Sequence, residues 1–188
     1  MLAAYGFGLF PLPAYREATR GPWRVVRHGP GPVTGYVSGP ALEPFRHVLY
    51  ERRRAWMSTS LMERESHAFH VDRARGAVVV AGLGMALYAY AAAHKPEVER
   101  VVVVERNPEV IALVAEAAAL QSWPGRAKVT ILAADALGPD LAGRVDAALA
   151  GRRPSWLYAD IWTDAGAAAA PAETAAMVRA LAPEAAGW

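Results

Sequence analysis

The sequence predicts an α/β fold, a three-layer Rossmann-like parallel sheet preceded by an N-terminal β-hairpin arm. Apolar runs dominated by valine, such as Ala77–Ala81 and Val101–Val104, alternate with segments of helical composition. Continuous β-branched runs are typical of strands buried on both faces of a parallel sheet. Alternation of strands and helices then places helices on both faces of that sheet.

The expected elements follow in chain order from residue 77. Strands are predicted at Ala77–Ala81, Val101–Val104, Lys128–Ala133 and Trp156–Ile161. Helices are predicted at Met85–His94, from Asn107 to about Leu120, and at Pro171–Leu181. Only 24 residues follow Asp164, and their composition indicates one helix. We therefore expect the sheet to be truncated at its C-terminal end.

The N-terminal region has a different character, because residues 1–45 are rich in glycine and proline. Met1–Leu12 is apolar but has no basic segment before it, which favours a packed or extended arm over a signal peptide. Trp23–Arg27 and Thr34–Ser38 flank the turn-forming Gly29–Pro32, which predicts a β-hairpin. Pro44–Trp56 is interpreted as a helix. These features divide the chain into an N-terminal unit, residues 1–55, and a ligand-binding unit, residues 56–188.

Composition limits the chemistry of this chain. Of its 188 residues, 54% are hydrophobic and 20% are charged, which is typical of a chain with a packed core. The absence of cysteine excludes disulfides, thiolate metal sites and thiol nucleophiles, and fits a cytoplasmic protein. A net charge of +2 does not indicate a nucleic-acid partner. The longest apolar stretch, Ala77–Ala93, is interrupted by glycines and is shorter than the ~20 residues of a membrane-spanning helix.

A glycine turn follows the first predicted strand. Gly82, Gly84 and Ala86 stand at alternate positions where this strand passes into a helix. Ligands of open parallel sheets bind at the carboxyl ends of the strands, where glycine lets the backbone approach them closely. A dinucleotide fingerprint requires a third glycine where Leu87 stands. The looser spacing suits S-adenosylmethionine (SAM), although packing alone also accounts for such a turn.

Acidic residues follow the next three strands. Glu105 lies 23 residues after Gly82, where a carboxylate can accept hydrogen bonds from ribose hydroxyls. Asp135 follows the third strand and is suited to the exocyclic amine of adenine, with a helix cap as the alternative. Asp160 ends the fourth strand, where it can act as a general base or orient the nucleophile. We expect these strand ends to converge at one edge of the sheet.

These motifs resemble those of class I SAM-dependent methyltransferases, and more narrowly of the spermidine-synthase-like branch. The residues that carry the resemblance are Val78–Leu87, Val102–Ile111, Val129–Leu137 and Tyr158–Asp164, preceded by Trp56–Glu63. The resemblance spans about residues 56 to 165.

The resemblance implies a role for particular residues. Gly82 and Gly84, with Met85 beside them, would line the methionine and ribose parts of SAM. Glu105, followed by Arg106, would bind the ribose. Asp135 with Ala136 would bind the adenine, and Asp160 would face the acceptor. Ser58, Thr59 and Glu63 would close over the site. No metal is implied.

Other residues have competing interpretations. His67 and His70, with Glu63, are interpreted as a polar helix face or a lid rather than a metal site. Arg52–Arg54 is interpreted as a solvated helix face rather than a site for an anionic partner. Trp56 and Trp162 are candidates for stacking on a ligand.

The expected function is therefore methyl transfer from SAM to a small acceptor that the sequence does not identify. Two alternatives remain open. One is an aminopropyltransferase that uses decarboxylated SAM, although its paired acids would normally be three residues apart and Asp160 and Asp164 are four apart. The other is a non-catalytic binding or assembly module. An exposed sheet edge would favour pairing into a homo-oligomer.

Overall fold

The valine-rich runs form the predicted parallel sheet. The computed structural model describes residues 8–188, apart from the side chains of residues 164 and 165. Its parallel strands are β7 (Gly76–Ala81), β8 (Val98–Glu105), β9 (Val129–Ala133), β10 (Trp156–Ala159) and β11 (Ala185–Gly187). They lie side by side in the order β9-β8-β7-β10-β11. This is the 3-2-1-4-5 order with which doubly wound α/β sheets begin, and it is compatible with a Rossmann-like core.

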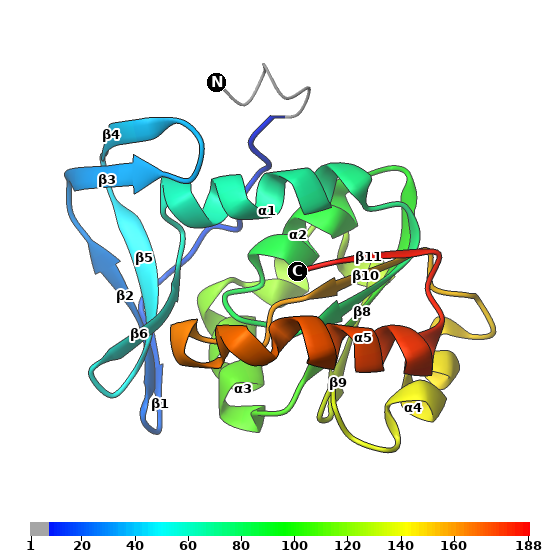
Figure 1. Cartoon of the computed structure of the whole chain (residues 1–188). Coiled ribbons are helices and arrows are strands. Elements are labelled where there is room, and N and C mark those ends of the chain that lie inside the picture. Colours follow the sequence, from blue (N-terminus) through cyan, green and yellow to red (C-terminus); the bar gives the residue numbers. More distant parts are fainter. Residues whose placement is uncertain (1–7) are drawn as a thin grey trace.

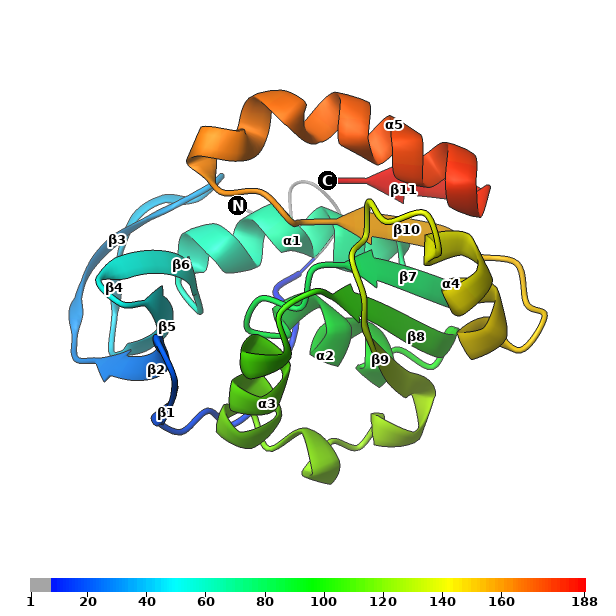
Figure 2. The ribbon, with the colours of Figure 1, turned by 90° about the horizontal axis from the view of Figure 1, so that it is seen from below.

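Helices cover both faces of the sheet (Figures 1 and 2). The helices α1 (Leu61–Arg73), α2 (Leu87–His94) and α3 (Pro108–Ala117) share one core cluster with Val78 and Val80. The helices α4 (Leu141–Leu149) and α5 (Ala170–Leu181) share the other with Val79. Neighbouring residues of β7 thus face opposite layers, as a buried parallel strand requires. Short 3₁₀ turns occur at Leu120–Ser122, Arg126–Lys128 and Asp164–Ala169. Within residues 8–188, no helix combines the length and the apolar character needed to cross a bilayer.

The N-terminal strands pair differently from the predicted hairpin. A four-stranded antiparallel sheet has the order β1 (Ala18–Arg20), β2 (Trp23–His28), β5 (Arg46–Glu51) and β6 (Arg54–Ser58). A separate hairpin joins β3 (Gly31–Gly35) to β4 (Gly39–Glu43). Both predicted strand runs are therefore extended in part, but they do not pair with each other. The first run forms β2, and all six residues of β2 pair with β5 instead.

The helix predicted at Pro44–Trp56 is wrong. This segment forms β5 and β6, which are joined by a two-residue turn in which Arg52 has a φ of 52°. The β-forming residues Val48 and Leu49 pair with β2, and this tertiary pairing overrides the helical spacing of the apolar residues. The predicted domain boundary after residue 55 consequently falls inside β6.

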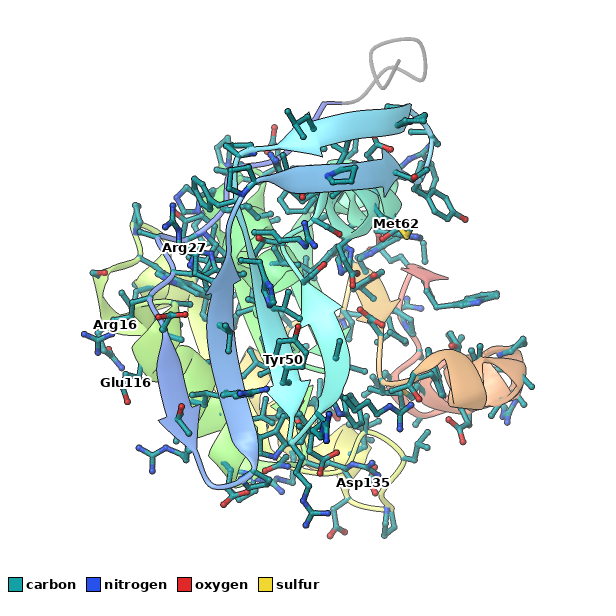
Figure 3. The ribbon with its side chains drawn as sticks, turned by 90° about the vertical axis from the view of Figure 1, so that its left-hand side faces the viewer. Arg16, Arg27, Tyr50, Met62, Glu116 and Asp135 are labelled. Atoms are coloured by element: carbon teal, nitrogen blue, oxygen red, sulfur yellow. The ribbon has the colours of Figure 1, made fainter. Side chains whose placement is uncertain are left out.

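The N-terminal sheet packs against the helical layer next to it. Trp23, Val25 and Leu49 are buried in the same cluster as α3. Figure 3 looks onto the opposite face of this sheet, and Arg16 and Glu116 meet at its edge in a salt bridge of 3.4 Å. Residues 8–17 precede β1 without regular structure, and Phe10 is buried, so this part of the predicted arm is packed. Residues 1–7 of the arm lie outside the described residues.

The segment after Asp164 holds more than the single helix that was expected. After α5 the chain forms β11, which extends the sheet beside β10. The sequence also did not predict α4, or the long helix α1 that precedes β7. The strand β11 has the residues Ala185, Ala186 and Gly187, whose small side chains carry little of the β-propensity that identified the other strands.

The glycine turn is positioned by a close backbone contact. Gly82 has a φ of 94°, and a β-carbon at this residue would lie 2.2 Å from the carbonyl oxygen of Asp160. The Asp160 amide donates a hydrogen bond of 2.9 Å to the Ala81 carbonyl. The ends of β7 and β10 therefore touch at a point that only glycine allows.

We predict that Gly82→Ala destabilises the protein more than Gly151→Ala does. Gly151 also has a positive φ, 79°, but a β-carbon there would meet no atom of the described residues within 4 Å. Gly151→Ala should therefore cost only the left-handed backbone conformation, about 1 kcal/mol. Gly82→Ala should cost roughly 1–3 kcal/mol more because of the clash. Chemical denaturation of both variants measures the difference, and equal losses would contradict the importance of this contact.

Candidate functional site

A cleft of about 730 Å³ lies between the N-terminal sheet and the carboxyl ends of the parallel strands. Its volume is in the range of sites for small organic ligands and cofactors. Seven of the eight predicted site residues line it, namely Gly82, Gly84, Glu105, Arg106, Asp135, Ala136 and Asp160. The expected convergence of the strand ends at one edge is thus seen in the structure. The exception is Met85, whose side chain is fully buried in the core.

The N-terminal sheet contacts the glycine turn through Met57 of β6. The Met57 sulfur of β6 accepts a hydrogen bond of 3.1 Å from the Met85 amide. The same sulfur would lie 2.4 Å from a β-carbon at Gly84, so the missing side chain of this glycine makes room for Met57. Met85 therefore contributes its backbone to the turn, and its side chain does not reach the cleft.

Glu105 joins the glycine turn to the end of β8. One oxygen of its carboxylate accepts the Leu83 amide at 3.0 Å, and the other accepts the Asn107 amide at 2.8 Å. Asn107 in turn caps α3, because its side chain accepts the Glu109 amide at 2.9 Å. A carboxylate oxygen has a second lone pair, so both oxygens retain acceptor capacity toward a ligand in the cleft.

The residues after β9 form the far end of the cleft. Asp135 is exposed, and its carboxylate accepts the Leu137 amide at 2.9 Å in a tight local turn. Ala136 is buried beneath this turn and lines the cleft with its small side chain. Arg106 is exposed at the rim. Asp135 is thus fixed by its own backbone while one carboxylate oxygen stays available.

The opposite wall comes from residues that sequence reasoning did not find. Trp23, Glu51 and Arg54 line the cleft from β2, β5 and β6. They were missed because the segment that holds two of them was expected to be a helix. The β-branched and aromatic side chains around Val48 and Tyr50 were the signal that could have identified a strand there.

A β-bulge aims Trp56 at the cleft. Leu49 pairs with Met57 and Tyr50 pairs with Ala55, so Trp56 has no partner on β5. Bulges of this kind redirect side chains. The Trp56 ring lies 5.3 Å from the Trp23 ring, and its indole nitrogen donates to Glu51 at 3.3 Å. Trp56 was a predicted stacking residue, and the structure places it on the cleft wall.

The segment after β10 forms another part of the cleft lining. The Arg54 guanidinium donates to the Thr163 hydroxyl at 2.7 Å, which ties β6 to this segment. Trp162 lines the cleft, and its indole nitrogen donates to Glu173 of α5. Arg54 thus has a structural partner, while Arg52 and Arg53 lie exposed in the β5–β6 turn and not on a helix.

The residues before β7 take separate roles. Glu63 lines the cleft. Ser58 does not line the cleft. Its hydroxyl accepts the Ser60 amide at 3.2 Å just before α1. Thr59 is buried, and its hydroxyl accepts the His47 amide at 3.0 Å. Of the three residues expected to close over the site, the structure brings Glu63 alone to the cleft lining.

The two histidines of α1 do not form the polar face that was expected. His67 is only 2% exposed and packs beside Tyr158. Its Nε2 atom lies 3.5 Å from the Asp160 carboxylate. Burial opposes a charge on His67, but the adjacent Asp160 outweighs this effect, so the pKa of His67 is raised. For His70, burial and the nearby His67 lower the pKa to about 4.

The function of the cleft is interpreted from its geometry, because comparison of the sequence with known proteins identifies no family. Neither the protein-family models nor the curated proteins provide a match to this chain. Among the described residues, no group of three or more His, Asp and Glu side chains is arranged to hold a metal ion. The cleft is therefore characterised by its carboxylates, its aromatic wall and the glycine turn.

We predict that His70 makes the fold sensitive to acid. Its folded-state pKa of about 4 lies below the ordinary 6.5, so the unfolded chain binds a proton first as the pH falls. The resulting stabilisation is complete above pH 6.5 and is lost between that value and about 4. His70→Phe should therefore lose less thermal stability than the wild type between pH 7.5 and pH 4.5. Parallel Tm curves for the two proteins would contradict this assignment.

Proposed function

We propose that this chain is a SAM-dependent methyltransferase that acts on a small acceptor. The observation that carries the proposal is the shared cleft, which is lined by the glycine turn, Glu105, Asp135 with Ala136, and Asp160. These groups follow four adjacent parallel strands, β7, β8, β9 and β10. In doubly wound sheets this edge binds nucleotide ligands.

The residues of the cleft are suited to the parts of SAM. Glu105 has acceptor capacity for the ribose hydroxyls, in addition to the amides that it already binds. Asp135 and the small Ala136 are suited to the amine and the flat face of adenine. The glycine turn leaves room for the methionine part next to Asp160.

The charge of the cleft supports a cationic ligand. Within the part of the chain that the structure describes, six acidic side chains and two arginines line the cleft. The acids are Glu51, Glu63, Glu105, Asp135, Asp160 and Glu173, and the arginines are Arg54 and Arg106. Carboxylates favour the sulfonium of SAM by direct attraction. A pyrophosphate would instead be repelled by most of these groups. This charge distribution supports the finer assignment of the Rossmann-like core to the methyltransferase type.

Methyl transfer requires the protein mainly to position the acceptor next to the methyl group. SAM, when bound, supplies a methyl group activated by the positive sulfur. Trp56 and Trp162 line the cleft, where their rings would exclude water from a bound ligand, and the glycine turn would let the ligand approach the backbone closely. Asp160 would orient the acceptor and take up its proton.

A second candidate function rests on the same acidic excess. Decarboxylated SAM lacks the negative carboxylate of SAM, so it carries more positive charge into this cleft. An aminopropyltransferase is therefore the alternative that the charge distribution favours. The side chain of Asp164, the second acid of that hypothesis, is not among the described side chains.

We predict that SAM and S-adenosylhomocysteine both bind, and that Glu105→Gln weakens their binding at least about tenfold, or ~1.4 kcal/mol. The glutamine retains one acceptor oxygen but presents an amide where Glu105 accepts hydrogen bonds. Isothermal titration calorimetry measures the effect, with Asp146→Asn as control, because Asp146 is exposed on α4 away from the cleft lining.

Three results would overturn or redirect this proposal. No binding of either ligand at millimolar concentration excludes SAM. A clear preference for decarboxylated SAM supports the aminopropyltransferase instead. Binding without a labelled product, after incubation with labelled SAM and a metabolite extract, indicates a non-catalytic module.

A further inference from the structure

A small cavity continues inward from the cleft behind the glycine turn. Its volume of about 10 Å³ is at the lower limit of what can hold one water molecule. It shares Gly82, Gly84 and Asp160 with the cleft, and its inner wall includes His67 and Tyr158. The cavity therefore provides a short path from Asp160, at the proposed acceptor position, to the buried His67.

His67 is held in one orientation at the end of this path. Its Nδ1–H donates a hydrogen bond of 2.6 Å to the Glu63 carbonyl, since a carbonyl can only accept. In the neutral ring this leaves the lone pair on Nε2, which is buried and has no hydrogen-bond partner among the residues that the structure describes. The Asp160 carboxylate lies 3.5 Å from this nitrogen. Nε2 of His67 and the Asp160 carboxylate are both acceptors, so a proton held between them stabilises the pair.

We propose that His67 and Asp160 form a proton relay, in which Asp160 removes a proton from the acceptor and His67 stores it. This inference rests on the proposed methyl transfer and specifies the acceptor as an amine or hydroxyl that loses a proton on reaction. Asp160 faces the substrate, whereas His67 acts through Asp160 and is a positioning residue.

The electron and proton balance of the step is simple. The lone pair of the acceptor nitrogen or oxygen forms the new bond to the methyl carbon. The bond from that carbon to the sulfonium sulfur breaks, and its electron pair remains on sulfur. The proton of the acceptor passes to the Asp160 carboxylate and then to Nε2 of His67, which releases it to solvent after the product leaves.

The groups around His67 favour a proton at this position. The carboxylates of Asp160 and of Glu63, on its own helix, both raise the pKa of His67, against the effect of burial. His70 lies one turn further along α1, and its lowered pKa leaves it neutral above about pH 4. Tyr158 of β10 and Tyr88 of α2 stack at 4.2 Å, and burial raises the pKa of both phenols, so they remain uncharged.

A histidine that only fills space would behave differently. His67 contacts the rings of Phe10 and Tyr158, so its substitution will affect stability in either case. The distinguishing property is the coupling between its protonation and the charge of Asp160. That coupling is measurable in the free protein, without a known acceptor.

The first test is an NMR titration of the full chain labelled with ¹⁵N-histidine. We expect the His67 ring to titrate above pH 6.5, and its midpoint to fall by about one pH unit or more in Asp160→Asn. Asp146→Asn, a matched change on the exposed side of α4, should leave the midpoint unchanged. A neutral His67 throughout pH 5–8, or the same midpoint in Asp160→Asn, would overturn the relay.

The second test is calorimetry with SAM and S-adenosylhomocysteine near pH 7 in buffers of different ionisation enthalpy. The positive sulfur of SAM, placed beside Asp160, should displace a proton from His67, and the neutral sulfur of S-adenosylhomocysteine should not. The difference in proton release should disappear in His67→Gln. Equal proton release for both ligands in the wild type sinks the relay but leaves methyl transfer standing. Failure of both to bind removes the proposed function, whatever the titration of His67 shows.

Discussion

The structure depends on the contact between the α-carbon of Gly82 and the carbonyl group of Asp160. Strands β7 and β10 pair in parallel through Ala81 and Ala159, and this contact continues their association beyond the sheet. It places the carboxylate that follows β10 directly over the turn that follows β7. Glu105 holds the same turn from the β8 side through the Leu83 amide. Three strands thereby fix one short loop, which gives the cleft a rigid floor.

The N-terminal sheet supplies the part of the site that the parallel sheet lacks. Met57 fills the space that Gly84 leaves open, and the bulge at Trp56 turns an indole ring toward the cleft. Arg54 then joins this sheet to the segment after β10 through Thr163. A ligand in the cleft would therefore contact two units that are distant in sequence, and motion of the antiparallel sheet would change the access to it.

The electrostatic environment changes from the cleft lining to the core behind it. Among the described residues, carboxylates predominate along the cleft lining, and such a lining attracts cations. Behind Asp160 the environment becomes apolar, with buried tyrosines around His67. A proton is stabilised at the boundary between these regions, because the histidine there faces a carboxylate while burial discourages an isolated charge. Binding and proton transfer would thus use the same charged group.

The sequence by itself determined the parallel core and the positions of its functional strand ends. Valine runs identify β7 and β8, because a strand buried on both faces needs apolar side chains at every position. Glycine and acidic residues just beyond such strands must then meet at one edge. The tertiary structure decided how β5 and β6 pair, and it alone decided that Met85 turns into the core and that His67 is buried beside Asp160. Each of these depends on contacts between segments far apart in the chain, which local spacing does not encode.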